Sequence, residues 1–208
     1  MSRRKQRLWL LPVLIGLAIL VTIASRAQDQ NALRPPKGAS LAIVVFEDLQ
    51  CPDCALAAPL VEEASRTYKI PVVRHDFPLP QHNWSRDAAI LARWFDTKSV
   101  KIGNEFRDRV FANQESIGTP DQLRAFAEKF AEEKKMTLPF AADPQGKLAA
   151  LVEADKALGT RIGIQHTPTI YVVSNNHTGT PFVEVVDRSQ LYSLIDEMKA
   201  GLSQSASR

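Results

Sequence analysis

Cysteine is scarce in this sequence of 208 residues, which contains only Cys51 and Cys54. A structural zinc site needs four ligands, usually two cysteine pairs or one pair together with two closely spaced histidines. The sequence has no second cysteine pair, and its histidines are scattered without such spacing, at positions 75, 82, 166 and 177. The sequence therefore argues against a metal site, and we expect neither a metal ion nor a separate cofactor.

An excess of one charge is also missing from most of the chain. The formal net charge is +3 at pH 7, but four positive charges lie in residues 1–7, which leaves the rest of the chain at −1. Proteins that bind nucleic acid usually carry a basic patch on the binding domain. The charge distribution therefore gives no indication of a nucleic-acid partner.

Long apolar runs are limited to the uncharged segment 8–25, LWLLPVLIGLAILVTIAS. A run of about 18 residues is long enough for a membrane-spanning helix and long for the core of a signal peptide. The basic residues 1–7 should stay in the cytoplasm. Because ASRAQ (24–28) is a poor cleavage site, we expect a transmembrane anchor rather than a cleaved signal sequence, with a buried core helix as a third alternative.

Both of the first two alternatives place the rest of the chain on the extracytoplasmic side, where disulfides form and persist. We expect a single-pass protein of the cell membrane with a periplasmic domain, or a secreted protein if segment 8–25 is cleaved. The polar segment 26–40, with two adjacent prolines, is typical of a linker. The predicted folded domain covers residues 41–201, and residues 202–208 form a tail.

Within this domain, the short apolar run 41–46, rich in β-branched residues, predicts a buried strand, and Pro52 fits the first turn of a helix that follows. A second strand is expected within residues 69–79. Helical spacing of apolar residues then predicts a block of helices over about 83–159, including helices at 99–114, after Thr119, and at 143–159. The aromatic residues of this block are expected to form a core rather than a ligand pocket.

The final part of the domain reads as a hairpin of strands 169–173 and 182–186, followed by a helix from about Leu191. The element order is therefore strand, helix, strand, helical block, hairpin and helix. This order predicts an α/β domain with a mixed sheet flanked by helices and an inserted helical subdomain. No internal repeat is visible.

The two cysteines follow the first strand in the segment FEDLQCPDCALAAP (46–59). A structural disulfide across two residues would constrain little of the unfolded chain, because the stabilisation grows with loop length. If Pro52 begins a helix, Cys51 lies at its N-terminus, where free N–H groups and the helix dipole stabilise a thiolate. Cys54, one turn later, would then attack a mixed disulfide at Cys51. The spacing favours a redox-active pair, with a structural disulfide as the alternative.

Several segments resemble the DsbA-like branch of thioredoxin-fold proteins: DLQCPDC after a strand, a helix interrupted by Pro59, HDFPL (75–79), and LGTRIGIQHTPTIYVV (158–173). The resemblance covers residues from about 38 to 201. It implies a thioredoxin-like fold, with Cys51 as the attacking thiol, Cys54 as the resolving thiol, and Pro52 and Asp53 as the active-site dipeptide. It also implies that Pro168 is a cis-proline facing the pair and that Thr167 presents backbone groups to a substrate.

Two positions depart from the family pattern. Many members have a buried acid six residues before the first cysteine, where this chain has Val45, while Glu47 and Asp48 lie nearby. We expect Asp48 to cap the loop, although it fits the family motif and could tune the cysteines. His166 stands where the family tends to have glycine. It could steady the thiolate of Cys51, but we expect it to point to solvent.

The expected function is thiol–disulfide exchange with cysteine-containing protein substrates, assisted by a membrane-bound or soluble redox partner. We favour an oxidase over a reductase or isomerase, although the carboxylate of Asp53 should raise the pKa of Cys51 and make the pair less oxidising. A thioredoxin-like module that binds or chaperones clients without turnover is the alternative from another class.

Overall fold

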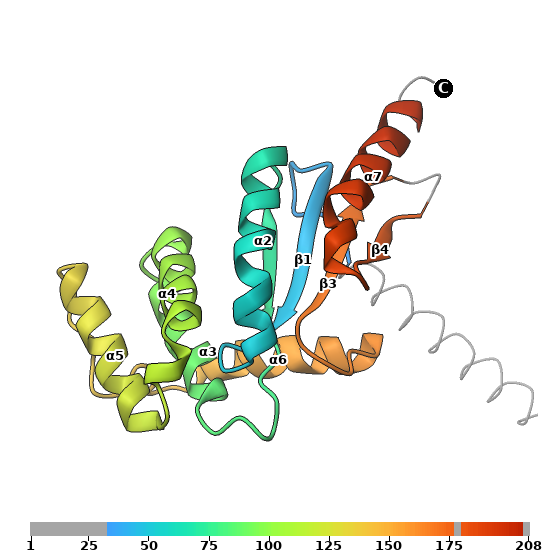
Figure 1. Cartoon of the computed structure of the whole chain (residues 1–208). Coiled ribbons are helices and arrows are strands. Elements are labelled where there is room, and N and C mark those ends of the chain that lie inside the picture. Colours follow the sequence, from blue (N-terminus) through green and yellow to red (C-terminus); the bar gives the residue numbers. More distant parts are fainter. Residues whose placement is uncertain (1–32, 177–179, 206–208) are drawn as a thin grey trace, which may run out of the picture. The chain divides into compact units, whose positions relative to one another are not determined.

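The computed structural model describes residues 33–176 and 180–205 (Figure 1). The predicted basic N-terminus 1–7, the predicted anchor or signal 8–25, and residues 26–32 of the predicted linker lie outside the described residues. The part of that linker which is described, residues 33–40, contains neither helix nor strand. Over the described ranges, no helix combines the length and the apolar character needed to cross a membrane.

A four-stranded mixed sheet forms the centre of the fold, in the order β2-β1-β3-β4. Strand β1 pairs in parallel with β2 and antiparallel with β3, which in turn pairs antiparallel with β4. The mixed sheet and the final hairpin are therefore confirmed. The strands are β1 (Leu41–Glu47), β2 (Val72–Asp76), β3 (Thr169–Ser174) and β4 (Phe182–Glu184).

The register of the two central strands brings together the loops that carry the predicted site. Every residue of β1 and of β3 is buried, as expected for strands covered on both faces. Phe46 near the end of β1 pairs with Thr169 at the start of β3. The loop that leaves β1 toward Cys51 therefore lies beside the loop that enters β3 through Pro168.

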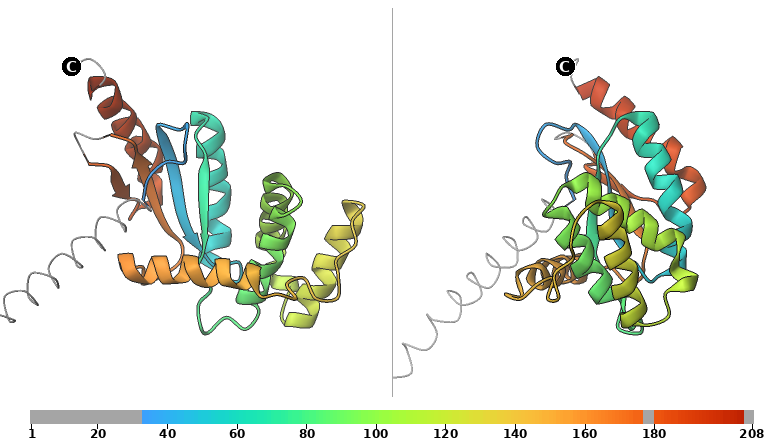
Figure 2. Two further views of the ribbon diagram at one scale, coloured as in Figure 1. Left: turned by 180° about the vertical axis from the view of Figure 1, so that it is seen from behind. Right: turned by 90° about the vertical axis from the view of Figure 1, so that its left-hand side faces the viewer.

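Helices cover both faces of the sheet, as Figure 2 shows from two sides. On one face, side chains of β1 and β3 share a buried cluster with apolar residues of two helices, α2 (Pro52–Tyr68) and α7 (Leu191–Ser205). On the other face lies α6 (Lys147–Ile162), whose Gly159 packs against Phe77 and Phe46. A Cβ atom on Gly159 would lie only 2.6 Å from the Phe77 ring, so a glycine is required for this close contact.

The remaining helices lie beside α2, on the side away from α7 (Figure 1). Their aromatic side chains pack against one another: the ring centroids of Phe95 and Phe106 are 4.6 Å apart, and those of Phe95 and Phe130 are 5.0 Å apart. These residues belong to a buried cluster, so the prediction that they form a core is confirmed. The helices are α3 (Ser85–Asp96), α4 (Val100–Ala112), the 3₁₀ turn η1 (Gln114–Ser116) and α5 (Pro120–Glu133).

A buried group of charged side chains connects α4 to its neighbours. Both terminal nitrogens of Arg107 donate to the carboxylate of Asp96, at 2.9 Å each, and one lies 4.0 Å from Asp76. Arg93 donates to Asp76 at 2.5 Å and also to Asp155 of α6. The side chains of Arg107 and Asp76 are almost fully buried. These ion pairs link the helices beside α2 to β2 and to α6.

Candidate active site

Cys51 lies directly before α2, with Pro52 as the first residue of the helix. Its backbone is extended, at φ −77° and ψ 121°, and its carbonyl accepts hydrogen bonds from the backbone N–H groups of Cys54 and Ala55. Proline at this position removes only an N–H group that would have no partner within the helix. The sequence therefore places Cys51 at the positive end of the helix dipole.

The surroundings of Cys51 favour its ionised form. The pKa of Cys51 is lowered to about 5, chiefly by the side-chain hydrogen bond with Cys54, and further by the Thr167 side chain and the backbone N–H groups of Cys54 and Asp53. Burial opposes this effect, because the exposed fraction of Cys51 is only 6%. A group with this pKa is mostly a thiolate at neutral pH and is therefore reactive toward disulfides.

Cys54 has the opposite character. Its exposed fraction is 2%, and its Sγ accepts a hydrogen bond from the backbone N–H of Asp48 at 3.4 Å. Burial raises the pKa of Cys54 above its usual range, and the hydrogen bond to Cys51 and the charge of Glu47 add to this effect. Both cysteines are free thiols here. At neutral pH one sulfur is thus ionised while its neighbour keeps a proton and donates to it.

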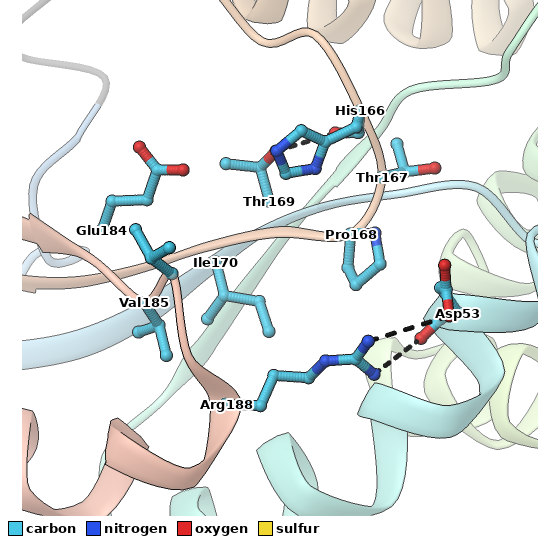
Figure 3. Close-up of a pocket in the computed structure, with 10 residues that line it drawn as sticks. Asp53, His166, Thr167, Pro168, Thr169, Ile170, Glu184, Val185 and Arg188 are labelled. Atoms are coloured by element: carbon cyan, nitrogen blue, oxygen red, sulfur yellow. Dashed lines mark hydrogen bonds and ion pairs between the residues drawn. The ribbon is translucent and has the colours of Figure 1, made fainter.

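The loop before β3 closes the other side of the pair. The Thr167–Pro168 peptide bond is cis, and the Sγ of Cys51 lies 3.3 Å from the carbonyl oxygen of Thr167, 116 positions away in the sequence. Beside Pro168 is a pocket of about 240 Å³, with Asp53, His166, Glu184 and Arg188 around it (Figure 3). Thr167, whose carbonyl oxygen contacts Cys51, also lines this pocket.

Asp48 organises the loop that leads to Cys51. One carboxylate oxygen accepts from the backbone N–H of Gln50 at 2.7 Å, while the other lies 2.7 Å from the backbone N–H of Leu79 and 2.7 Å from Nδ1 of His82. The backbone carbonyl of Asp48 accepts from the N–H of Cys51. These contacts are those of a residue that caps the loop.

His166 and Glu47 differ in exposure. The side chain of His166 is exposed at the rim of the pocket, and its backbone carbonyl accepts a hydrogen bond from the Thr169 hydroxyl. Glu47 is buried and forms an ion pair with Arg74 at 2.7 Å. Since Glu47 and Val45 are two positions apart on β1, their side chains lie on the same face of the sheet. Position 45, where many family members have a buried acid, is valine, but Glu47 places a carboxylate on the same face of the sheet. The charge of Glu47 raises the pKa of Cys54.

Sequence reasoning did not single out two further residues that contact the site. Arg188, in the 3₁₀ turn η2 (Arg188–Gln190) after β4, donates to the backbone carbonyl of Asp53. Gln114 of η1 donates its side-chain amide to the carbonyls of Leu49 and Cys51, at 2.8 and 3.1 Å. Both lie more than 60 positions from their partners in the sequence, and no local pattern marks them. Over the described ranges, no group of three or more His, Cys, Asp or Glu side chains is arranged to hold a metal ion.

Comparison with known families agrees with this geometry. Residues 36–196, about three quarters of the chain, match the profile of the family described as thioredoxin. The chain belongs to the thioredoxin family. The matched residues of this thioredoxin-family protein include both cysteines, the cis-proline and all four strands.

Solved structures show that the fold is that of DsbA-like thioredoxin-fold proteins, as the sequence predicted. The α-DsbA1 protein of Wolbachia pipientis is 17% identical, with a TM-score of 0.64 over 82% of this chain and 92% of that one. ScsC of Proteus mirabilis is 21% identical, with a TM-score of 0.63 over 94% and 93%. DsbA2 of Pseudomonas aeruginosa is 23% identical, with a TM-score of 0.59 over 79% and 92%.

Curated relatives of the thioredoxin-family chain are much longer than the chain itself. The chain is 26% identical over 160 residues to the Na⁺/H⁺ antiporter NhaA 3 of Salinispora tropica and to NhaA 1 of Salinispora arenicola. The aligned region covers 76% of this chain but only 24% of each antiporter. The chain therefore spans about a quarter of the length of these relatives.

Proposed function

We propose that this protein is a thiol–disulfide oxidoreductase that exchanges disulfides with cysteine-containing proteins through Cys51 and Cys54. The observation that carries the proposal is the opposite ionisation of the two thiols: the pKa of Cys51 is lowered to about 5, while burial raises that of Cys54. A structural disulfide needs no such difference. A binding module without turnover would have no use for a reactive thiolate near the pocket beside Pro168.

The exchange proceeds through a mixed disulfide at Cys51. A substrate thiolate attacks Cys51 of the oxidised pair, and the electrons of the broken bond pass to Cys54, which takes up a proton. A second substrate thiol then attacks the mixed disulfide, forms the substrate disulfide and releases Cys51 as a thiolate. Two electrons thus pass from the substrate to the protein. A thiol of low pKa is a good leaving group, so Cys51 favours this release.

We further propose that the protein acts as an oxidase outside the cytoplasm and that a membrane-bound or soluble redox partner regenerates its disulfide. A stabilised Cys51 thiolate favours the reduced form and therefore makes the disulfide an oxidant. The N-terminal apolar segment supports an extracytoplasmic location with a membrane anchor. One structural neighbour, from Salmonella enterica, is described as a periplasmic thioredoxin-like protein.

A trapping experiment tests the exchange reaction. In a Cys54→Ser variant, the Cys51 thiolate should attack client disulfides and accumulate mixed disulfides, because Cys54 is no longer present to resolve them by attacking the sulfur of Cys51. These adducts should disappear on reduction in a non-reducing gel assay. A Cys51→Ser variant is the matched control and should trap nothing. Absence of adducts with the Cys54→Ser variant would favour the binding module.

The direction of electron flow follows from the reduction potential of the pair. If the protein is an oxidase, equilibration with glutathione should give a value nearer the about −120 mV of DsbA than the about −270 mV of thioredoxin. The measurement needs only the wild-type protein and a read-out of its redox state. A value at the thioredoxin end would instead assign the protein as a reductase.

A further inference from the structure

Arg188 reaches from the segment between β4 and α7 to the dipeptide between the two cysteines (Figure 3). Its Nη1 donates to the backbone carbonyl of Asp53 at 3.3 Å, and its Nη2 lies 3.7 Å from a carboxylate oxygen of the same residue. The contact spans 135 positions of sequence. One arginine therefore holds both the backbone and the side chain of Asp53.

Asp53 affects Cys51 in two ways. Its backbone N–H is among the groups that stabilise the Cys51 thiolate. Its carboxylate carries a negative charge in the first turn of α2, and a like charge near a thiolate disfavours ionisation. The guanidinium of Arg188 lies against this carboxylate and offsets its charge. Both groups line the pocket beside Pro168, together with Thr167, whose carbonyl oxygen lies 3.3 Å from the Sγ of Cys51.

We propose that Arg188 is a positioning residue that sets the reduction potential of the cysteine pair by holding and neutralising Asp53. This inference rests on the proposed function, since a potential matters only for a pair that exchanges disulfides. The carboxylate of Asp53 alone would make the disulfide a weaker oxidant. With Arg188 in contact, the protein keeps an acidic residue between its cysteines and remains oxidising.

The relevant equilibrium is the reaction of the protein disulfide with two glutathione thiols, which gives the protein dithiol and one glutathione disulfide. Two electrons pass from glutathione to the protein. Because Cys51 is ionised in the reduced protein, anything that stabilises its thiolate shifts this equilibrium toward the dithiol. Arg188 stabilises the reduced protein in this equilibrium, because it offsets the charge of Asp53 near the Cys51 thiolate.

A double-mutant cycle with Arg188→Gln and Asp53→Asn tests the proposal. Arg188→Gln should lower the glutathione equilibrium constant about two- to fivefold, because the negative charge of Asp53 near the Cys51 thiolate is then no longer offset. That change corresponds to a potential about 9–21 mV more negative, at about 30 mV per tenfold. The pKa of Cys51, followed by thiolate absorbance, should rise in parallel. When Asp53 is already replaced by asparagine, Arg188→Gln should have a smaller effect. The logarithm of its fold-change in the glutathione equilibrium constant should be less than half of the value found in the wild-type background.

The control is Arg86→Gln, which removes the same charge from an exposed pair with Glu153 at 2.9 Å. Its potential should match the wild type. The proposal is overturned if Arg188→Gln changes neither the potential nor the pKa of Cys51, if its effect is equal with and without Asp53, or if Arg86→Gln has the same effect. Failure of the proposed function would instead appear as absent mixed disulfides in the Cys54→Ser variant, whatever the potentials are.

Discussion

Replacing Arg107 with methionine should lower the free energy of unfolding by about 3–5 kcal/mol, the range observed when one partner of a buried ion pair is removed. The side chain of Arg107 is 2% exposed, and its two hydrogen bonds to Asp96 are both 2.9 Å long. Methionine keeps most of the volume but leaves the carboxylate of Asp96 without this partner. A Cβ on Gly103 would lie 1.8 Å from that carboxylate, so the carboxylate occupies the space above the glycine and has little freedom to move.

Asp76 adds to the expected loss. It is fully buried, and burial raises its pKa while the charges of Arg107 and Arg93 lower it. Without Arg107, Arg93 remains as its hydrogen-bonded cation. Equilibrium unfolding in urea, at constant slope, measures the difference.

Arg109→Met is a matched control on the same helix, because Arg109 is half exposed and pairs with Glu133 at the surface. Its effect should stay within about 0.5 kcal/mol. Arg107→Lys, which keeps the charge but loses the two-pronged contact, should fall between the two. If Arg107→Met is no more destabilising than Arg109→Met, the buried ion pairs of Arg107 do not contribute measurably to the free energy of unfolding.

The reduced protein should become more stable as the pH rises from about 5 to about 8.5, and the Cys51 thiol should account for the change. The pKa of Cys51 is lowered to about 5 in the folded protein, against about 8.5 for an unfolded chain. For a lowered pKa, the stabilisation is complete above the unfolded value and is lost as the pH falls through the folded value. Each pH unit between these limits contributes about 1.4 kcal/mol, which amounts to about 2–3 kcal/mol at pH 7.

The comparison that isolates this effect is between the reduced wild type and a Cys51→Ala variant, measured by denaturant unfolding at several pH values. The other titrating groups are shared, so the difference between the two curves reports Cys51 and its coupling to Cys54. The difference should grow with pH and level off near pH 9. A difference that does not vary with pH would show that Cys51 ionises like an ordinary thiol, and the proposed reactivity would lose its basis.

The segments with the strongest local patterns were predicted correctly. The run 41–46 is a buried strand, and Pro52 begins the helix after it, because an uninterrupted apolar run rich in β-branched residues and a proline in a first turn have few other interpretations. The end of α6 was predicted wrongly. The sequence pattern predicts a helix that ends at Gly159, but that glycine lies inside the helix, where it allows close contact with Phe77. The helix ends before Gly163, which adopts a left-handed conformation at φ 88°.

The two cysteines and the proline facing them could be found from the sequence, because short motifs and the family resemblance mark them. The effect of Asp53 could not be judged in the same way. The sequence shows a carboxylate between two cysteines, whereas the folded chain adds an arginine from the other end of the domain. An argument from the dipeptide alone therefore omits a charge of opposite sign. Only the fold brings the segment between β4 and α7, which carries Arg188, beside Asp53 in the first turn of α2.

Two glutamine side chains connect the helical segment α3–α5 to the loop Leu49–Cys51. Gln114 donates hydrogen bonds to the carbonyls of Leu49 and Cys51, on either side of Gln50. The side-chain amide of Gln50 donates to Asn83 and accepts from the backbone N–H of Trp84. A shortened version of the domain, with a simple turn in place of α3–α5, would still contain every strand and both cysteines. It would nonetheless lose the hydrogen bonds that hold the Leu49–Cys51 loop, so this helical segment cannot be deleted without loosening the backbone around the nucleophile.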